Sequence, residues 1–170
     1  MDSICEQLIK IKKTFKEHAL LTLIWVVAFA VVYTLVWLSL KYVALMGLII
    51  IASFGVIYGA AQLTKRLSIE YEYIFVNHDM DIDKIIGKSS RKRMVSIKLN
   101  EVEEFGAYDD TAKAKLAHRN FDAKFICCNA DDNAEYMVVR HSKKGLVLIV
   151  VALNQRAREA ALRFIPRTAK

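Results

Sequence analysis

Proline is scarce in this chain, and charge is scarce over one long stretch of it. Pro166 is the single proline among 170 residues, which excludes a long proline-rich linker. Between Ala19 and Leu63 the only charged residue is Lys41, whereas the remainder is crowded with acidic and basic side chains. The hydrophobic content of 55% is therefore the average of a membrane-like portion and an ordinary soluble portion.

The weakly charged stretch is long enough for two membrane spans. One apolar run covers residues 19–40 and a second covers residues 42–63. Each is close to the roughly 20 residues that a helix needs to cross about 30 Å of hydrocarbon. Neither run has a polar face and no small-residue cleavage site separates them, which argues against a buried soluble helix and a signal peptide. The sequence predicts a transmembrane helical hairpin.

The flanking charges predict the orientation of this hairpin. Lys10, Lys12, Lys13 and Lys16 precede the first span, Lys65 and Arg66 follow the second, and Lys41 alone lies in the turn. Lysine and arginine are retained on the cytoplasmic side of a membrane, so both termini are expected in the cytoplasm. Three cysteines, an odd number, agree with a reducing compartment.

Residues 1–18 have the pattern of a short cytoplasmic amphipathic helix. Ile4, Leu8, Ile11 and Phe15 recur at helical spacing, and lysines occupy much of the remaining surface. Two arrangements stay open for such a helix. It could lie in the interface of the inner leaflet, or it could continue the first transmembrane helix into the cytoplasm.

Residues 64–170 form a soluble region of domain size with short alternating apolar segments. Asn154 is a candidate helix N-cap, and the last helix should end before Pro166. Residues 109–120 fit either a loop or a short helix. The fold class we predict is α+β, a PH-like antiparallel β-barrel or sandwich of six or seven strands closed by a C-terminal helix. The strand signals lie at residues 71–75, 80–86, 91–99, 105–108, 121–128, 135–139 and 146–152.

The chain also resembles a family of small, uncharacterised bacterial membrane proteins. The matching residues are Tyr71-Glu-Tyr-Ile-Phe75, Asn77, Asp81-Ile-Asp-Lys-Ile85, Arg91-Lys-Arg93 and Ile165-Pro-Arg167. In that family a PH-like domain of unknown function follows a transmembrane hairpin, so the resemblance implies this fold and a place in the bacterial inner membrane. Where relatives favour Asn-Gly in the first hairpin turn, this chain has Asn77-His78, which predicts a looser turn.

Two clusters suggest metal sites but fail on spacing. Asp79, Asp81 and Asp83 alternate like the start of a calcium loop, yet the sixth position is Lys84 and the twelfth is Ser90. The alternation instead fits one solvated face of a strand. Cys127-Cys128 lacks the C-x₂-C spacing of a zinc site, and both cysteines fit a strand. No cofactor or metal is predicted.

A basic cluster in the second hairpin of the soluble region is the main candidate site. Three interpretations stay open: nonspecific contact with anionic lipid, a solvated turn, and specific binding of phosphate. Nucleic acid is not predicted, because the membrane flanks already account for part of the net charge of +7. The candidate lipid-contact residues are Lys88, Arg91, Lys92 and Arg93, together with Lys65 and Arg66 next to the second span.

The function that we predict is presentation of a PH-like domain at the membrane for protein interaction or scaffolding. No catalytic motif is present, so the chain is not expected to be an enzyme. A first alternative is an accessory subunit whose hairpin packs into a larger membrane complex through Gly47, Gly55 and Gly59. A remote alternative is a membrane-bound enzyme, which would require a pocket joining at least two of four polar residues: Asp109, His118, Cys127 and His141.

Overall fold

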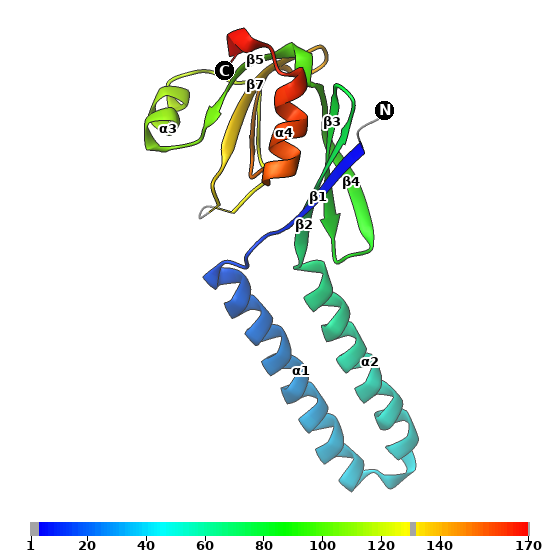
Figure 1. Ribbon diagram of the computed structural model, residues 1–170. Coiled ribbons are helices and arrows are strands. Elements are labelled where there is room, and N and C mark those ends of the chain that lie inside the picture. Colours follow the sequence, from blue (N-terminus) through cyan, green and yellow to red (C-terminus); the bar gives the residue numbers. More distant parts are fainter. Residues whose placement is uncertain (1–3, 130–131, 170) are drawn as a thin grey trace. The chain divides into compact units, whose positions relative to one another are not determined.

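The computed structural model describes residues 4–129 and 132–169, and the chain divides into a helical unit and a β-rich unit (Figure 1). The helical unit comprises residues 12–69 and 86–89, and the β-rich unit comprises the remainder. The elements are β1 Ile4–Lys10, α1 Phe15–Lys41, the 3-10 helix η1 Val43–Leu45, α2 Met46–Arg66, β2 Ile69–Val76, β3 Asp79–Ile86, β4 Ser90–Lys98, the 3-10 helix η2 Leu99–Glu101, β5 Val102–Ala107, α3 Asp110–Ala117, β6 Ala123–Ile126, β7 Glu135–His141, β8 Gly145–Val151, α4 Gln155–Phe164 and the 3-10 helix η3 Arg167–Ala169.

The helical unit is a hairpin of two long apolar helices, as the sequence predicts. Both α1 and α2 are long and apolar enough to span a membrane. The first turn of α1 is capped by Glu17, whose carboxylate accepts a hydrogen bond from the backbone N–H of Thr14. Most of the apolar side chains point outward, and in the two helices only Ala28, Ile49 and Ala60 are buried. Such an outward apolar surface suits lipid rather than water.

The predicted amphipathic helix over residues 1–18 is wrong for Ile4–Lys10, which form strand β1, while residues 1–3 lie outside the described part. β1 pairs antiparallel with β2, from Ile4 opposite Val76 to Lys10 opposite Glu70. Along β1 the exposure alternates: Cys5 is buried and Leu8 is exposed, although a helix would place these two residues on the same face. The segment follows the period of a strand because pairing with β2 gives it a whole ladder of hydrogen bonds.

The pairing of β1 with β2 makes the β-rich unit discontinuous in sequence. The predicted soluble region of residues 64–170 therefore lacks one of its strands, because β1, which precedes the first helix, belongs to the β-rich unit. The helical hairpin is an insertion between two neighbouring strands. It occupies the place that a short turn would take in an ordinary β-hairpin.

Eight strands form two four-stranded sheets, and the PH-like fold class is confirmed (Figure 1). The first sheet has the order β1-β2-β3-β4 and the second has the order β5-β7-β8-β6. The expectation of antiparallel strands throughout is wrong at one place, since β6 pairs parallel to β8. A parallel neighbour needs a crossover rather than a tight turn, and the chain between β6 and β8 passes through β7.

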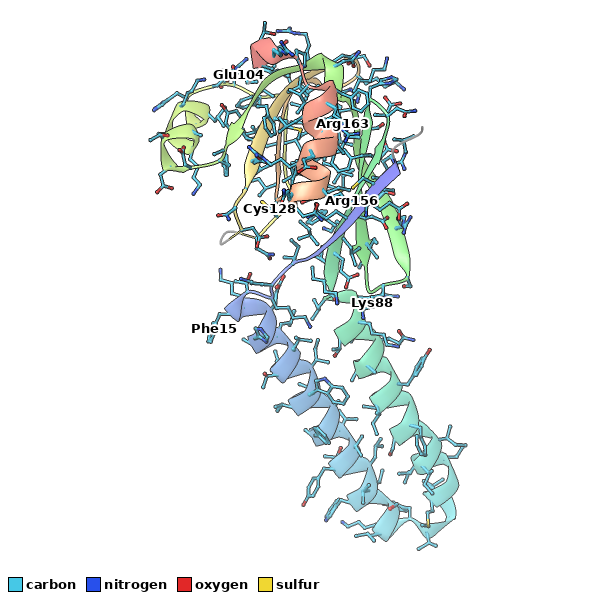
Figure 2. All side chains as sticks on the ribbon, in the orientation of Figure 1. Phe15, Lys88, Glu104, Cys128, Arg156 and Arg163 are labelled. Carbon is cyan, nitrogen blue, oxygen red and sulfur yellow. The ribbon has the colours of Figure 1, made fainter. Side chains whose placement is uncertain are left out.

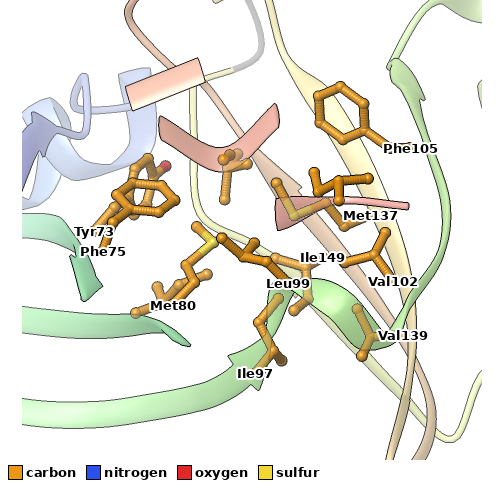
Figure 3. Close-up of a cluster of buried hydrophobic side chains, with 14 of the residues drawn as sticks. Tyr73, Phe75, Met80, Ile97, Leu99, Val102, Phe105, Met137, Val139 and Ile149 are labelled. Atoms are coloured by element: carbon orange, nitrogen blue, oxygen red, sulfur yellow. The ribbon is translucent and has the colours of Figure 1, made fainter. Parts of the chain in front are cut away.

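Buried apolar side chains from both sheets form the main core, with Tyr73, Met80 and Ile149 among its members (Figure 3). A second, smaller cluster lies on the opposite face of the second sheet, where Leu116 of α3 packs with Val138 and Leu148. Both faces of β8 are therefore covered. This explains its continuous run of β-branched and apolar residues, which the sequence indicates.

Two helices of the β-rich unit begin at side-chain caps. Asn154 Oδ1 accepts a hydrogen bond from the N–H of Ala157 at 2.8 Å, which confirms the predicted N-cap of α4. Asp109 caps α3 in the same way through Ala112, so the open choice for residues 109–120 resolves to a short helix. α4 ends at Phe164, before Pro166, because the residue preceding a proline disfavours the α conformation.

Candidate functional site

The aspartates of β3 do not form the fully solvated strand face that the sequence suggests. Arg93 of β4 binds two of them, with Nη1 2.7 Å from Asp81 Oδ2 and Nε 2.9 Å from Asp83 Oδ1. Asp83 is only 3% exposed, whereas the Arg93 side chain is half-exposed. No group of three metal-ligating side chains occurs among the described residues. The alternating acids are structural partners of an arginine.

The basic cluster of the second hairpin is divided by these contacts. Arg91 binds Glu72 of β2 at 2.9 Å, so both Arg91 and Arg93 form ion pairs with carboxylates of the first sheet. A guanidinium group that is already paired with a carboxylate attracts a phosphate less strongly than an unpaired one. Lys88 and Lys92 are exposed and, in the described part of the chain, form no ion pair. Of the four residues predicted in this hairpin, these two lysines are the ones with exposed charges, unpaired within the described structure, that could contact lipid.

Lys88 is placed by a specific turn that docks on the end of α2. Gly87 and Lys88 both have positive φ, 62° and 59°, as a two-residue type I′ turn requires. The Gly87 N–H donates to the carbonyl oxygen of Ser68 at 2.8 Å. A Cβ on Gly87 would lie 3.1 Å from the carbonyl oxygen of Lys65, so glycine allows this close approach.

Within the helical unit, cations gather at the end of the hairpin that holds the start of α1 and the docked turn, where Figure 2 labels Phe15 and Lys88. The start of α1 and the end of α2 lie at this end because the two helices are consecutive and antiparallel, and the docked turn adds Lys88. The opposite end has one cation, Lys41, whose ammonium lies 4.4 Å from the Trp37 ring centroid. The cations of the first end are Lys12, Lys13, Lys16, Lys65, Arg66 and Lys88, accompanied by Glu17.

The predicted packing glycines do not draw α1 and α2 together. A Cβ added at Gly47, Gly55 or Gly59 would meet no heavy atom of the described residues within 4 Å. An apolar groove of about 430 Å³ instead separates parts of the two helices, lined by Val27, Val56 and Gly59 among others. These three glycines of α2 therefore have open space beside their Cα atoms.

Three further cavities lie in the β-rich unit. One of about 450 Å³ is lined by Tyr108, Asp109, Glu135 and Arg158, and one of about 410 Å³ by residues including Asp81 and His141. Another, of about 330 Å³, lies beside Ile126 at the end of β6. None of the cavities described here is lined by two of the four residues that the enzyme alternative requires, which are Asp109, His118, Cys127 and His141.

Cys127 and Cys128 are thiols with little tendency to ionise. Burial raises the pKa of Cys127 to about 12, with a smaller contribution from Cys128, and burial raises that of Cys128 to about 11. The hydroxyl of Tyr73 donates to the carbonyl oxygen of Cys127, and its own pKa is also raised by burial. A reactive cysteine needs a lowered pKa, so these residues serve the core.

One polar contact that the sequence analysis missed closes the edge of β1. The side-chain amide of Gln7 donates from Nε2 to the carbonyl oxygen of Ala152 at 2.8 Å and accepts from the N–H of Asn154 at 3.0 Å. Gln7 thereby links β1 to the segment between β8 and α4. No local signal marks Gln7, since its partners lie about 145 residues away.

Comparison with known proteins gives one match. The family model described as "Bacterial PH-like domain (DUF6106)" matches residues 1–170, the whole chain. No curated protein and no solved structure matches the chain. The family match includes both the helical hairpin and the β-rich unit.

Proposed function

The chain belongs to the bacterial PH-like domain family, and from that premise we propose that it is a non-enzymatic membrane protein. Its helical hairpin anchors the PH-like domain at the cytoplasmic face of the bacterial inner membrane. The domain serves protein interaction or scaffolding there. Both chain termini lie in the cytoplasm, and the hairpin crosses the bilayer twice.

The pairing of β1 with β2 is the observation that carries this proposal. Lys10 and Glu70 are ladder partners, although the whole hairpin lies between them in sequence. β1 and β2 can pair only if both strands lie on the same side of the membrane, so the chain between them must cross the bilayer an even number of times. The concentration of cations at the domain-proximal ends of α1 and α2 supports the cytoplasm as that side.

Contact with anionic lipid forms the second part of the proposal. The residues that we assign to it are Lys65 and Arg66 at the end of α2, Lys88 on the docked turn, and Lys92. Each cation close to an anionic leaflet contributes about 1 kcal/mol of attraction. Arg91 and Arg93 are left out because their guanidinium groups bind Glu72, Asp81 and Asp83.

The membrane topology is tested by cysteine accessibility. In a chain whose three native cysteines are changed to alanine, we introduce Glu6→Cys on β1 or Val43→Cys between the helices. A membrane-impermeant maleimide should label Val43→Cys in spheroplasts and Glu6→Cys only in inverted vesicles. Labelling of Glu6→Cys in intact spheroplasts would reject the proposed orientation.

The interaction role is tested with a matched pair of chains. One is the full chain, and the other has residues 11–69 replaced by Asn-Gly, which joins Lys10 to Glu70 and removes the hairpin. Crosslinking and mass spectrometry should recover partners shared by both chains. Partners found only with the full chain would instead support the hairpin as the functional surface.

A second candidate is an accessory subunit of a larger membrane complex. The observation that favours it is the open surface around Gly47, Gly55 and Gly59, where an approaching helix backbone would meet no side chain. Under this proposal Gly55→Leu should abolish co-purification of the complex while the β-rich unit keeps its fold. Under the scaffold proposal the same variant retains its partners.

A further inference from the structure

The two sheets have four edge strands, and an open edge invites pairing with another chain. Three of the four edges carry a recognisable protection. Gln7 links β1 to Ala152 and Asn154, and η3 packs against β5. β4 carries the exposed Lys92, and the carbonyl oxygen of Met94 on this strand accepts a hydrogen bond from Lys144 Nζ at 3.2 Å.

β6 is the fourth edge, and it is the least protected. It pairs with β8 on one side, and no other described strand pairs with it. Its last residue, Ile126, is 58% exposed, more than any other large apolar side chain of the β-rich unit. A short strand and the exposed Lys124 are common protections of an edge, but an exposed isoleucine works against them.

A cavity lies beside the end of β6. It measures about 330 Å³ and is lined by Tyr108, Ile126, Cys128 and Ala134, with Lys113 and Asp132 among its polar lining residues. The size suits one large apolar side chain. A strand added to β6 would carry every second side chain toward this face of the sheet, because side chains alternate along a strand.

Cations without acidic partners lie beside the same strand. The ammonium of Lys124 is 5.6 Å from the Phe121 ring centroid, and that of Lys144 is 4.8 Å from the Phe125 ring centroid. Neither these lysines nor Lys143 forms an ion pair within the described residues. β6 thus combines one cation of its own and cations of the neighbouring β7–β8 turn with an apolar end next to a cavity.

We infer that the free edge of β6 binds an extended, acidic segment of a partner protein. The segment adds a strand to the second sheet, sets acidic side chains beside Lys124 and Lys144, and places one large apolar side chain in the cavity beside Ile126. The inference rests on the proposed function, because it names the surface and the kind of partner for the interaction role. Backbone pairing supplies affinity, and the cavity and cations supply selectivity.

The test is a selection from a random dodecapeptide display library on the full chain in nanodiscs of neutral lipid. Enriched peptides should share acidic residues and a large apolar residue. As fluorescent synthetic peptides, they should lose affinity at least tenfold with Ile126→Asp and severalfold with Lys124→Glu. Leu8→Asp is the matched control, since Leu8 is also exposed and lies on an edge strand, and it should leave the affinity unchanged.

The inference is overturned if no peptide is enriched, if the enriched peptides lack acidic residues, or if Leu8→Asp weakens binding as much as Ile126→Asp does. Circular dichroism of each variant must match the parent chain, and an Ile126→Lys variant repeats the test where Ile126→Asp alone alters the spectrum. If the peptide test fails but the hairpin-free chain still crosslinks the shared partners, only the β6 site is rejected and the proposed interaction role is retained. Loss of those partners as well would reject both proposals.

Discussion

Lys10 and Glu70 are partners in the antiparallel ladder of β1 and β2, and the helical hairpin is the chain between them. The PH-like domain is therefore complete only when the segment made before the first helix meets the segment made after the second. Both helices leave the same two-stranded ribbon. Only residues 11–14 and 67–68 separate the helices from these strands.

The discontinuous domain predicts which fragment will fold. A chain with residues 11–69 replaced by Asn-Gly should be soluble and should unfold cooperatively, because Lys10 and Glu70 are already adjacent. Residues 70–170 alone lack β1, including the buried Cys5 and the contacts of Gln7, and should be less stable by about 3 kcal/mol. Urea unfolding followed by circular dichroism compares the two. Equal stability would mean that β1 is dispensable.

Gln7 should contribute to stability through its two hydrogen bonds. Gln7→Ala removes the partners of the Ala152 carbonyl and the Asn154 N–H, with an expected loss of about 2 kcal/mol in the free energy of unfolding. Glu6→Ala is the matched control, because Glu6 is exposed on the same strand. The measurement is urea unfolding of the hairpin-free chain. A loss no larger than that of the control would show that water replaces both bonds.

A side chain at Gly87 should destabilise the docked turn. Gly87→Ala places a Cβ near the carbonyl oxygen of Lys65 and forces alanine to φ of +62°, with an expected cost of about 1–2 kcal/mol. Gly55→Ala is the control, since its Cβ meets nothing within 4 Å and the residue lies in a regular helix. Protease cleavage after Lys88 in detergent-solubilised full chain should accelerate for Gly87→Ala only. Equal cleavage of both variants would argue against a docked turn.

Arg93 should act in the fold rather than at the lipid surface. Arg93→Leu leaves the buried Asp83 without its guanidinium partner and should cost about 2 kcal/mol, moderated by the half-exposed position of Arg93. Lys92→Leu, on the neighbouring residue without an ion pair, should change stability little but weaken vesicle binding. The two variants are compared in urea unfolding and in flotation with anionic vesicles. Reversal of the two results would restore Arg93 as a lipid contact.

The sequence was sufficient for elements whose signals are local. The two long apolar runs predicted α1 and α2, and Asn154 predicted the start of α4. These signals depend on neighbours within one element, so tertiary contacts have little power to overturn them.

The sequence was insufficient where distant partners decide the structure. Residues 4–10 fit a helical period, and only their partner strand beyond the hairpin makes them a strand. The sequence indicated a solvated Asp83, whereas Arg93 of the next strand binds it. Nor did the sequence indicate that β6 pairs parallel to β8, because β7 lies between these two strands in the chain. For the candidate site, composition identified Lys88 on the turn and Lys92 on β4, but it could not show that Arg91 and Arg93 pair with carboxylates.

The buried thiols predict how stability changes at alkaline pH. Cys127 and Cys128 have folded-state pKa values of about 12 and about 11, above their ordinary value of 9.0. A raised pKa means that the unfolded chain loses these protons first, so their contribution is fully present below pH 9 and is lost as pH rises toward the folded values. Each thiol adds a slope of up to about 1.4 kcal/mol per pH unit in that window.

The contribution is measured by urea unfolding of the hairpin-free chain at intervals between pH 8 and pH 10, and the linkage from Tyr73, which begins near its ordinary pKa of 10.0, is common to both chains. The Cys127→Ala, Cys128→Ala double variant should be less stable at pH 8, yet its stability should fall less steeply with pH than that of the parent chain. Comparison of slopes separates proton linkage from the lost packing of two side chains. Parallel curves for the two chains would mean that the thiols ionise equally in the folded and unfolded states, against the burial of Cys127 in the core.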